Sequence, residues 1–341
     1  MKTMRAMQLA RIGAIRADSA PLERVDVPVP EPGAGEVRIR VRTCGVCHTE
    51  LDEIEGRTPP PRLPVTLGHE VVGVVDALGA GVVSPSLGTR VGVGWIHSST
   101  GRIDENLAPE FRATGRDVDG GYAEFMTVPA RYAFPIPPAF SDIEAAPLLC
   151  AGAIGYRALN LTGLGDGEAL GLMGFGGSAH LVLQLARHLY PRSRIAVFAR
   201  DADVRAFATR LGADWAGNTN ERAPFPLRAI IDTTPAWAPI VASLENLAPG
   251  GRLVINAIRK EDKDRDALAR LSYHEHLWLE REIKSVANIT GRDIERFLAV
   301  AAEIPLRPTV TPYALEDANR AVVELEQGRV SGAKVLVIDA R

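Results

Sequence analysis

The stretch LMGFGGSAH, residues 172–180, ends a segment that predicts a β-strand and opens one that predicts a helix. Gly174, Gly176 and Ala179 fit the pattern Gly-x-Gly-x-x-Gly/Ala. In this pattern the first glycine permits a tight turn, the second lets the backbone approach a pyrophosphate, and the small third residue lets helix and strand pack closely. Gly177 lies in the same turn, at the start of the helix. The free N–H groups there favour the binding of a phosphate group. A glycine cluster alone often only turns a chain, but the strand–turn–helix context favours a dinucleotide site.

Strand and helix patterns alternate around this turn. Short apolar runs predict strands, and the amphipathic segments between them predict helices. This alternation is typical of a parallel sheet covered by helices on both faces. The predicted fold class of this part is therefore α/β with a doubly wound parallel sheet. The predicted strands are 169–175, 194–199, 228–234, 252–258 and 282–288, and the predicted helices are 178–189, 203–212 and 239–247.

The end of the second predicted strand bears on the choice of cofactor. Dinucleotide folds that select NAD place Asp or Glu there to accept a hydrogen bond from the ribose 2′-OH. This chain has Ala199 at that point, followed by Arg200. A missing negative charge and an added positive one suit a 2′-phosphate, so the sequence favours NADP over NAD. The alternative is that Arg200 is an ordinary solvated arginine.

Residues 1–140 follow a different pattern, with short strands separated by glycine and proline. The segment EVRIRVRT, residues 36–43, alternates strictly, with Val37, Ile39 and Val41 on one face and arginines on the other. Such spacing predicts a compact β-rich barrel. Residues 97–118 have no clear period and are expected to form a long excursion.

Composition narrows the classes of function. The net charge of −3 gives no electrostatic footprint for nucleic acid. No apolar run is long enough to span a bilayer, and the N-terminus lacks the apolar core of a secretory signal, so we expect a cytoplasmic protein without a membrane partner. The cysteine count is three, which argues against a disulfide framework.

The cysteines point instead to metal chemistry or to simple burial. Two lie in RTCGVCHTELDE, residues 42–53, and the third is Cys150. Cys47, His69 and Cys150 would make a Cys₂His set, which suits a catalytic zinc with an open fourth position. Because these residues lie far apart in the sequence, spacing alone is weak evidence, and a lone buried cysteine is usually structural.

Taken in order, these motifs resemble the zinc-dependent alcohol dehydrogenases of the medium-chain dehydrogenase/reductase superfamily, over nearly the whole chain. The resemblance implies a GroES-like catalytic domain over residues 1–153, a Rossmann NAD(P)-binding domain over 154–289, and a C-terminal return to the catalytic domain over 290–341. The motifs are CGVCHTE (44–50), GHEVVG (68–73), DGGYAEF (119–125), AAPLLCAG (145–152) and GFGGSAH (174–180).

The resemblance also assigns roles. It implies that a hydride passes between the carbon of an alcohol or aldehyde substrate and the nicotinamide, in a homo-oligomer such as a dimer or tetramer. The last strand of the parallel sheet is a candidate edge for dimer pairing. The implied residues are Cys47, His69 and Cys150 as zinc ligands, Glu70 as the acid beside the metal, Thr49 as the hydroxyl that takes the substrate proton, His48 near the cofactor phosphates, and Trp95 in the substrate pocket.

The chain departs from the family pattern at several points. Residues 97–112 lack the four cysteines of a structural zinc, so one zinc is expected. Glu50 replaces the aspartate that orients a ligand, and Asp52 replaces a histidine that often ends the proton relay. Lys334 is a candidate substitute for an arginine near the pyrophosphate, although a lysine at a strand edge is expected to lie in water. The family assigns no metal to Cys44, which is expected to be buried.

Two rival functions remain at this point. One is a polyol or sugar dehydrogenase of the same superfamily, which differs in its substrate pocket. The other is a non-catalytic NAD(P)-binding relative, which the altered segment HTELD leaves open. The complete ligand set, Thr49 and the glycine turn argue against the second.

Overall fold

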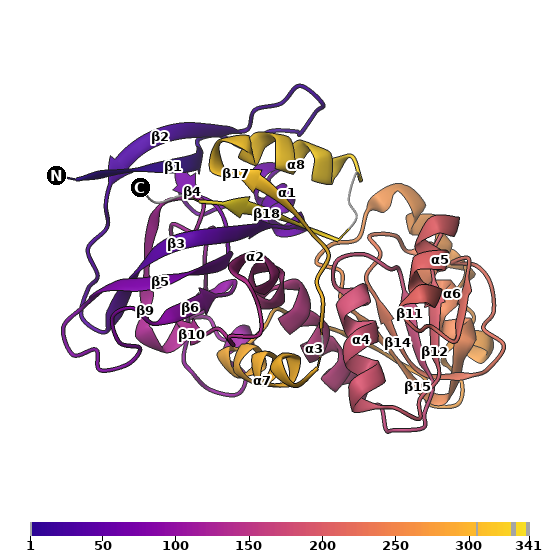
Figure 1. Cartoon of the computed structure of the whole chain (residues 1–341). Helices are drawn as coiled ribbons and strands as arrows, with labels where there is room; N and C mark the ends of the chain where they lie inside the picture. Colours follow the sequence, from indigo (N-terminus) through magenta and orange to yellow (C-terminus); the bar gives the residue numbers. More distant parts are fainter. Residues whose placement is uncertain (1, 305, 329–331, 339–341) are drawn as a thin grey trace. The chain divides into compact units, whose positions relative to one another are not determined.

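The computed structural model describes residues 2–304, 306–328 and 332–338 (Figure 1). The chain divides into two compact units. The first comprises Met1–Ala153, Asn288–Glu303 and Arg307–Arg341, and the second comprises Ile154–Ala287 and Ile304–Leu306. None of the described helices is long and apolar enough to cross a membrane.

The first unit is built from β-strands. Its largest sheet has the order β10-β6-β5-β3-β18-β17, with β9 also paired to β3, and a smaller sheet has the order β2-β1-β4. The strands are β1 Thr3–Leu9, β2 Leu22–Pro28, β3 Glu36–Val46, β4 Val65–Thr66, β5 Glu70–Leu78, β6 Arg90–Val93, β7 Ile96–Ser98, β8 Arg112–Ala113, β9 Phe125–Pro129, β10 Phe134–Pro135, β17 Val310–Ala314 and β18 Ala333–Val337. The helices are α1 His48–Ile54, α2 Asp142–Ala145, α7 Gly291–Glu303 and α8 Ala318–Glu326, and α3 Ala151–Thr162 crosses the boundary between the units.

Strand β3 organises this unit. Val37, Ile39 and Val41 are fully buried, as the alternating pattern predicts, while Arg40 and Arg42 are exposed. The strand pairs with β5, β9 and β18, so β18 of the C-terminal segment forms part of the same sheet. Residues 305, 329–331 and 339–341 of the predicted C-terminal return lie outside the described residues.

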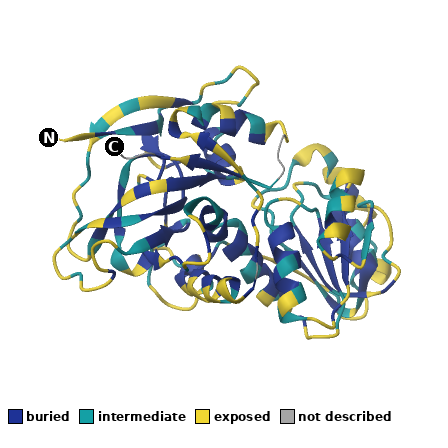
Figure 2. Cartoon of the chain, viewed as in Figure 1, coloured by how far each residue is buried: buried dark blue, intermediate teal, exposed yellow. Residues whose placement is uncertain are grey.

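The second unit contains the predicted parallel sheet. Its order is β13-β12-β11-β14-β15-β16, and every neighbouring pair is parallel. The central strands are buried along their whole length, with helices beside them (Figure 2). Each large apolar side chain buried here contributes roughly 1.5–3 kcal/mol. The strands are β11 Leu170–Met173, β12 Ile195–Phe198, β13 Trp215–Gly217, β14 Leu227–Asp232, β15 Leu247–Ile255 and β16 Glu282–Ser285, and the helices are α4 Ala179–Leu189, α5 Ala202–Arg210 and α6 Ala238–Asn246.

The prediction that Lys334 lies in water is wrong. Strand β18 lies between β3 and β17 rather than at the sheet edge, and only 3% of Lys334 is exposed. Its Nζ donates to the hydroxyl of Tyr313 at 2.6 Å and pairs with the carboxylate of Glu324 at 3.0 Å. Burial of an ammonium is tolerated because these partners replace its water.

The excursion between residues 97 and 118 is held by a buried carboxylate. Glu105 is 3% exposed. It accepts hydrogen bonds from the Tyr132 hydroxyl at 2.7 Å, from the Gly101 N–H at 2.9 Å, and from the Gly291 N–H at the start of α7 at 2.7 Å. Charge-assisted bonds of this kind are stronger than neutral ones, so Glu105 fastens the excursion to two other segments.

Candidate active site

The register of β3 against β5 brings two sequence motifs together. In this antiparallel pair Gly45 lies opposite Glu70. Cys47 follows the end of β3, and His69 immediately precedes β5, so both leave the sheet at the same place. A single strand pairing therefore positions two of the three predicted zinc ligands.

The backbone of α1 fixes Cys47. Cys47 is the N-cap of the helix, and its sulfur accepts a hydrogen bond from the Thr49 N–H at 3.3 Å. Glu50 completes a capping box, because its Oε2 accepts from the Cys47 N–H at 2.8 Å. An N–H donor directed at the sulfur stabilises a thiolate more than a thiol.

Glu50 also orients His69. Its Oε1 lies 2.6 Å from Nδ1 of His69, and both side chains are almost wholly buried. The other ring nitrogen, Nε2, faces the sulfur of Cys47 at 3.4 Å. One carboxylate thus holds the backbone of one predicted ligand and the ring of another. This is the arrangement that commonly surrounds metal-bound histidine.

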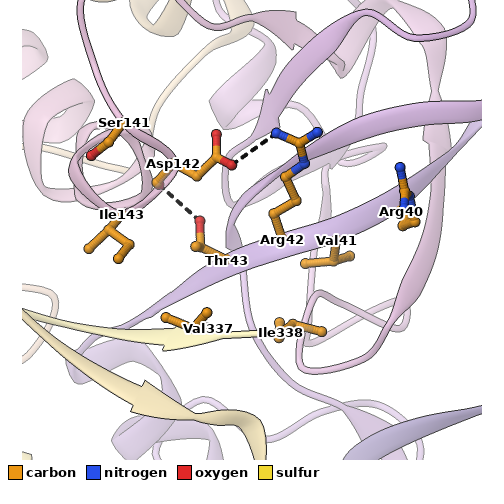
Figure 3. Close-up of a pocket in the computed structure, with 9 residues that line it drawn as sticks. All are labelled: Arg40, Val41, Arg42, Thr43, Ser141, Asp142, Ile143, Val337 and Ile338. Atoms are coloured by element: carbon orange, nitrogen blue, oxygen red, sulfur yellow. Dashed lines mark hydrogen bonds and ion pairs between the residues drawn. The ribbon is translucent and has the colours of Figure 1, made fainter. Parts of the chain in front are cut away.

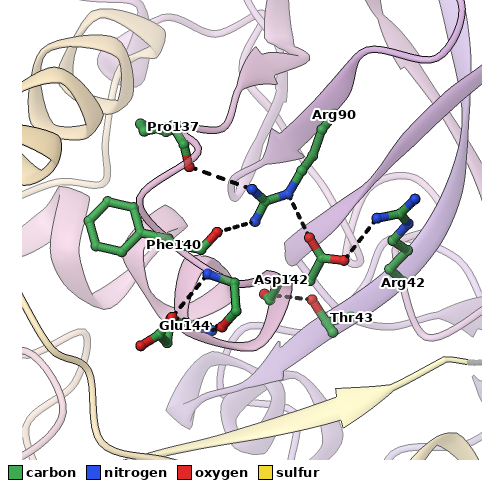
Figure 4. A network of polar contacts seen from close by, with 8 residues as sticks. Arg42, Thr43, Arg90, Pro137, Phe140, Asp142 and Glu144 are labelled. Carbon is green, nitrogen blue, oxygen red and sulfur yellow. Dashed lines mark hydrogen bonds and ion pairs between the residues drawn. The ribbon is translucent and has the colours of Figure 1, made fainter.

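The segment that carries Cys150 is anchored to the sheet. Ser141 and Glu144 form a capping box at the start of α2. The first helical residue, Asp142, pairs with Arg90 at 2.6 Å and with Arg42 at 3.2 Å (Figure 4). The 3₁₀-helix η3, Ala146–Leu149, then leads directly to Cys150.

A hollow of about 410 Å³ lies beside this anchor (Figure 3). It is lined by residues of β3, the start of α2 and the end of β18, among them Thr43, Asp142 and Val337. None of the predicted zinc ligands lines it, so this hollow is separate from the metal cluster.

Four side chains form a compact cluster. One ligand atom from each of Cys47, His69, Glu70 and Cys150 lies within 4.8 Å of the others. The hydrogen bond that the Cys47 thiol donates to Cys150, together with burial, raises the pKa of Cys47 well above its ordinary value. For Cys150 the bond with Cys47 lowers the pKa, but burial and the Glu70 and Glu50 carboxylates outweigh it and raise the pKa. Burial raises the pKa of Glu70 to about 8.

These shifts describe a site that favours a cation. Burial opposes protonation of His69, but Glu50 and Cys47 outweigh it and raise the pKa of His69 well above its ordinary value. Because the two thiols and the carboxyl are crowded together, the negatively charged thiolate and carboxylate forms destabilise one another. A divalent cation relieves this, and sulfur with nitrogen donors suits zinc in particular.

Two glycines allow close packing at and beside the cluster, and the sequence motifs alone did not explain them. A Cβ on Gly45 would lie 1.7 Å from Oε2 of Glu70. Gly68 has φ of +96°, and a Cβ there would lie 2.3 Å from the Tyr122 ring and 2.9 Å from the sulfur of Cys44. Cys44 is fully buried against this turn and is not part of the cluster, as expected.

The other predicted site residues of the first unit lie on α1 or beside the metal cluster. Thr49 is 6% exposed and lies on α1 immediately after the exposed His48. Asp52 is buried, and its Oδ1 pairs with Nε of Arg57 at 2.5 Å. The ring of Trp95 is centred 6.2 Å from that of His69, which places this side chain beside the cluster.

Glu53 is a buried acid that sequence reasoning missed. It lies one helical turn after Glu50 on α1 and is 0% exposed. Glu53 lies three residues after Glu50, and this spacing predicts that both lie on the same face of the helix. That spacing is the feature of the sequence from which the burial of Glu53 could have been predicted.

The glycine turn has the expected local geometry. Gly174 has φ of +86°, and a Cβ there would lie 2.7 Å from Oγ1 of Thr233. Gly176 has nothing within 4 Å of such a Cβ, and Ala179 is buried under the start of α4. The turn can therefore admit a phosphate group close to its backbone, with Gly177 beside it.

Glu50→Gln is expected to weaken zinc binding roughly 10- to 100-fold, the usual cost of losing such a partner. One carboxylate oxygen accepts from the Cys47 N–H, and the other lies 2.6 Å from Nδ1 of His69. A glutamine has one acceptor oxygen, so one of these donors would face an NH₂ group. Titration against a competing chelator measures the affinity. Glu50→Asp keeps both acceptors and should lose less, while equal affinity of the glutamine variant and the unaltered protein would contradict the assigned role.

Comparisons with known proteins agree with this geometry. Residues 33–138 match the model of the alcohol dehydrogenase GroES-like domain. A protein of Mycobacterium tuberculosis (strain CDC 1551 / Oshkosh) described as probable alcohol dehydrogenase AdhA is 43% identical over 347 residues, which cover 98% of each chain. An NAD-dependent alcohol dehydrogenase of Sulfurisphaera tokodaii is 32% identical and covers 98% of this chain and 100% of the relative.

The fold is shared with solved structures as well. The structure of a thermostable alcohol dehydrogenase from Pyrobaculum aerophilum superimposes with a TM-score of 0.86 at 23% identity, covering 98% of this chain and 100% of that one. The predicted combination of a GroES-like domain with a parallel-sheet α/β domain is thereby confirmed. With a 43% identical relative along its whole length and a Cys₂His–Glu cluster at the matching motifs, this chain belongs to the zinc-type medium-chain alcohol dehydrogenases, which are NAD(P)-dependent oxidoreductases acting on CH–OH groups.

Proposed function

We propose that the protein is an alcohol dehydrogenase and aldehyde reductase that works with one zinc ion per chain and prefers NADP(H). The cluster of Cys47, His69, Glu70 and Cys150 carries this proposal. Cys47, His69 and Cys150 hold the zinc, and Glu70 is the acid beside it. Zinc bound there supplies a Lewis acid that makes the substrate hydroxyl more acidic.

The chain itself moves the proton. The Thr49 hydroxyl takes the proton of the substrate hydroxyl, because it can donate and accept at once. Asp52, on the same helix, is the proposed next acceptor. His48 serves the cofactor phosphates, and Trp95 lines the substrate pocket.

A single zinc per chain follows from the cysteine inventory. The chain has three cysteines, and Cys44 is buried in the packing beneath Gly68. The excursion that would carry a structural zinc contains no cysteine and is fastened through Glu105 instead.

The preference for NADP rests on the turn after β12. Ala199 is 5% exposed and brings no carboxylate, and Arg200 is exposed at the same turn. Arg205 on α5 supports the turn by donating to the carbonyls of Ala199 at 2.8 Å and Arg200 at 2.7 Å. Asp201 accepts from two N–H groups at the start of α5, so its Oδ1 is engaged as the helix cap. One relative is described as NAD-dependent, so the cofactor preference of this chain is inferred from its own Ala199 and Arg200.

NADP(H) is therefore expected to be used with a specificity constant about tenfold above that of NAD(H). A charge-assisted hydrogen bond contributes roughly 1.5–3 kcal/mol, and the exposure of Arg200 favours the lower end. Nicotinamide absorbance with primary alcohols, aldehydes and polyols, run with both cofactors, measures this and tests the activity. Arg200→Ala should lower the NADP specificity constant and leave NAD almost unchanged, and Ala199→Asp should weaken NADP further.

Arg210→Ala is the matched control, because Arg210 is also exposed but ends α5. Equal specificity constants for the two cofactors in the unaltered protein would disprove the NADP preference without affecting the alcohol dehydrogenase assignment.

We also propose that the protein forms a homo-oligomer through β16. This strand ends the parallel sheet, and all four of its residues are exposed, including the apolar Ile283 at 43%. Open edges of this kind pair with other strands. Light scattering should give at least twice the monomer mass, and Ile283→Lys should reduce it. Val83→Lys, at a residue 93% exposed, is the control. A monomeric unaltered protein would contradict the proposal.

A further inference from the structure

The hollow beside the start of α2 lies where two strands meet the same edge of β3 (Figure 3). On that edge β9 pairs with β3 as far as Arg40, and β18 pairs with it from Thr43 onward. Val41 and Arg42 lie between these two pairings. The hollow has a volume of about 410 Å³, which falls within the range of about 300–1,000 Å³ that is usual for small-molecule sites. It can therefore hold a small organic molecule.

Arg42 occupies an irregular position in β3. On the edge that faces β5, Val41 lies opposite Gly73 and Thr43 lies opposite Val72. Arg42 is therefore an extra residue with no partner across β5, which makes this point a β-bulge. A bulge bends its strand and changes the direction of the side chains it carries. Here the bulged residue is an arginine that lines the hollow.

Three arginines alternate along one face of β3, and they differ in their ion pairs. Arg38 pairs with Asp76 at 2.9 Å, and Arg42 pairs with Asp142 at 3.2 Å. Within the part of the chain that the structure describes, no ion pair or hydrogen bond engages the guanidinium of Arg40. Arg40 and Arg42 are exposed, and both line the hollow (Figure 3). The hollow therefore has one unpaired guanidinium and a second that is shared with an acid.

The charge at the hollow favours a single anion. Asp142 is the one acid among the described residues that line it. Its Oδ1 lies 2.6 Å from Nε of Arg90, and its Oδ2 lies 3.2 Å from Nη1 of Arg42 (Figure 4). Because Arg90 does not line the hollow but offsets the charge of Asp142, the positive charge of Arg40 and Arg42 is in excess. A ligand with one negative charge can pair with Arg40 without displacing Asp142.

The hydroxyl groups at the hollow are engaged within the chain. Thr43 donates to the carbonyl of Asp142 at 2.9 Å, and Ser141 donates to the carboxylate of Glu144 at 2.7 Å. The side-chain donors that remain for a ligand are the guanidinium groups. Because a guanidinium has donors and no acceptor, the ligand group that meets it must accept hydrogen bonds.

Apolar side chains supply the rest of the lining. Val41 is fully buried, Ile338 is 3% exposed, Val337 is 38% exposed and Ile143 is half-buried. A ligand with a hydrocarbon body can remove the exposed part of this surface from water, which is favourable. A small inorganic anion cannot do so. The lining therefore suits an anion that carries an apolar body.

We propose that this hollow binds a small organic anion whose carboxylate pairs with Arg40 and Arg42 and whose aliphatic chain lies against Val41, Ile143 and Val337. Arginine suits a carboxylate because its planar fork can donate two parallel hydrogen bonds. No predicted zinc ligand lines the hollow, so this site is separate from the metal cluster. The proposal does not depend on the proposed alcohol dehydrogenase activity.

The test is a ligand-observed NMR titration of the protein with hexanoate, acetate, inorganic phosphate and 1-hexanol. We expect hexanoate to bind with a Kd on the order of millimolar. Acetate and phosphate should bind about tenfold more weakly or worse, because they lack the hydrocarbon chain. Arg40→Ala and Arg42→Ala should each weaken hexanoate binding by about tenfold, the usual effect of one charge-assisted hydrogen bond. Neither variant should change the affinity for 1-hexanol, which carries no charge.

Two further variants locate the binding. Arg38→Ala is the matched control, because Arg38 lies on the same face of β3 but is paired with Asp76 and does not line the hollow. It should bind hexanoate as the unaltered protein does. Cys47→Ser, which removes a sulfur from the metal cluster, should also retain hexanoate binding.

Three results would overturn the inference. The first is a hexanoate affinity that both Arg40→Ala and Arg42→Ala leave unchanged. The second is loss of hexanoate binding in Cys47→Ser, which would assign the carboxylate to the metal cluster. The third is equal affinity for hexanoate and phosphate, which would exclude the apolar contact. If Arg42→Ala does not fold because Asp142 loses a partner, Arg40→Ala decides, since it breaks no contact among the described residues.

Discussion

Cys47→Ser or Cys150→Ser is expected to remove the bound zinc and nearly all alcohol dehydrogenase activity. Each replacement takes one sulfur from a set in which the ligand atoms lie within 4.8 Å of one another. A serine hydroxyl stays protonated near neutral pH and is a poor replacement for a thiolate. Elemental analysis should give about one zinc equivalent for the unaltered protein and a value near zero for either variant.

Cys44→Ser is the matched control, because it makes the same replacement three positions before Cys47. Cys44 is fully buried against the Gly68 turn and does not belong to the metal cluster. The control should keep both zinc and activity, at some cost in stability, since a buried hydroxyl replaces a sulfur. Loss of zinc from Cys44→Ser, or a reproducible value near two equivalents in the unaltered protein, would disprove the single-site assignment.

The features that sequence predicted best are those set by local patterns. The turn at Gly174 needs a positive φ, and the alternation of Val37, Ile39 and Val41 marks one face of a strand. Both follow from the conformations open to single residues and from the period of a strand. The segment 178–189 is similarly predictable, because its amphipathic period matches α4.

The features that sequence missed depend on strand order and on packing. Lys334 has the pattern of an exposed strand residue, and only the position of β18 between β3 and β17 buries it. Glu53 resembles a solvated acid in an acidic segment until α1 packs that face inward. The closeness of Gly45 and Glu70 likewise requires the register of β3 against β5, which no local pattern specifies.

Thr49→Val is expected to lower kcat for alcohol oxidation by about 10²- to 10⁴-fold while zinc remains bound. The contact of this residue with the metal site runs through its backbone, whose N–H donates to the Cys47 sulfur at 3.3 Å. Valine keeps that N–H and the branched shape of threonine, so the ligand geometry is preserved and only the hydroxyl is lost. Steady-state kinetics together with metal analysis separate the two effects.

Thr49→Ser is the control that keeps the hydroxyl, and it should retain most of the activity. In the proposed route the substrate proton passes from Thr49 toward solvent, so loss of the next acceptor should change the pH dependence of the rate. Asp52 is buried and paired with Arg57, so Asp52→Asn should reduce alcohol oxidation most at low pH, where accepting a proton is already difficult. An unchanged pH–rate profile would exclude Asp52 from the route. Full activity of Thr49→Val would show that the proton leaves without this hydroxyl, because the variant alters no other group that can carry it.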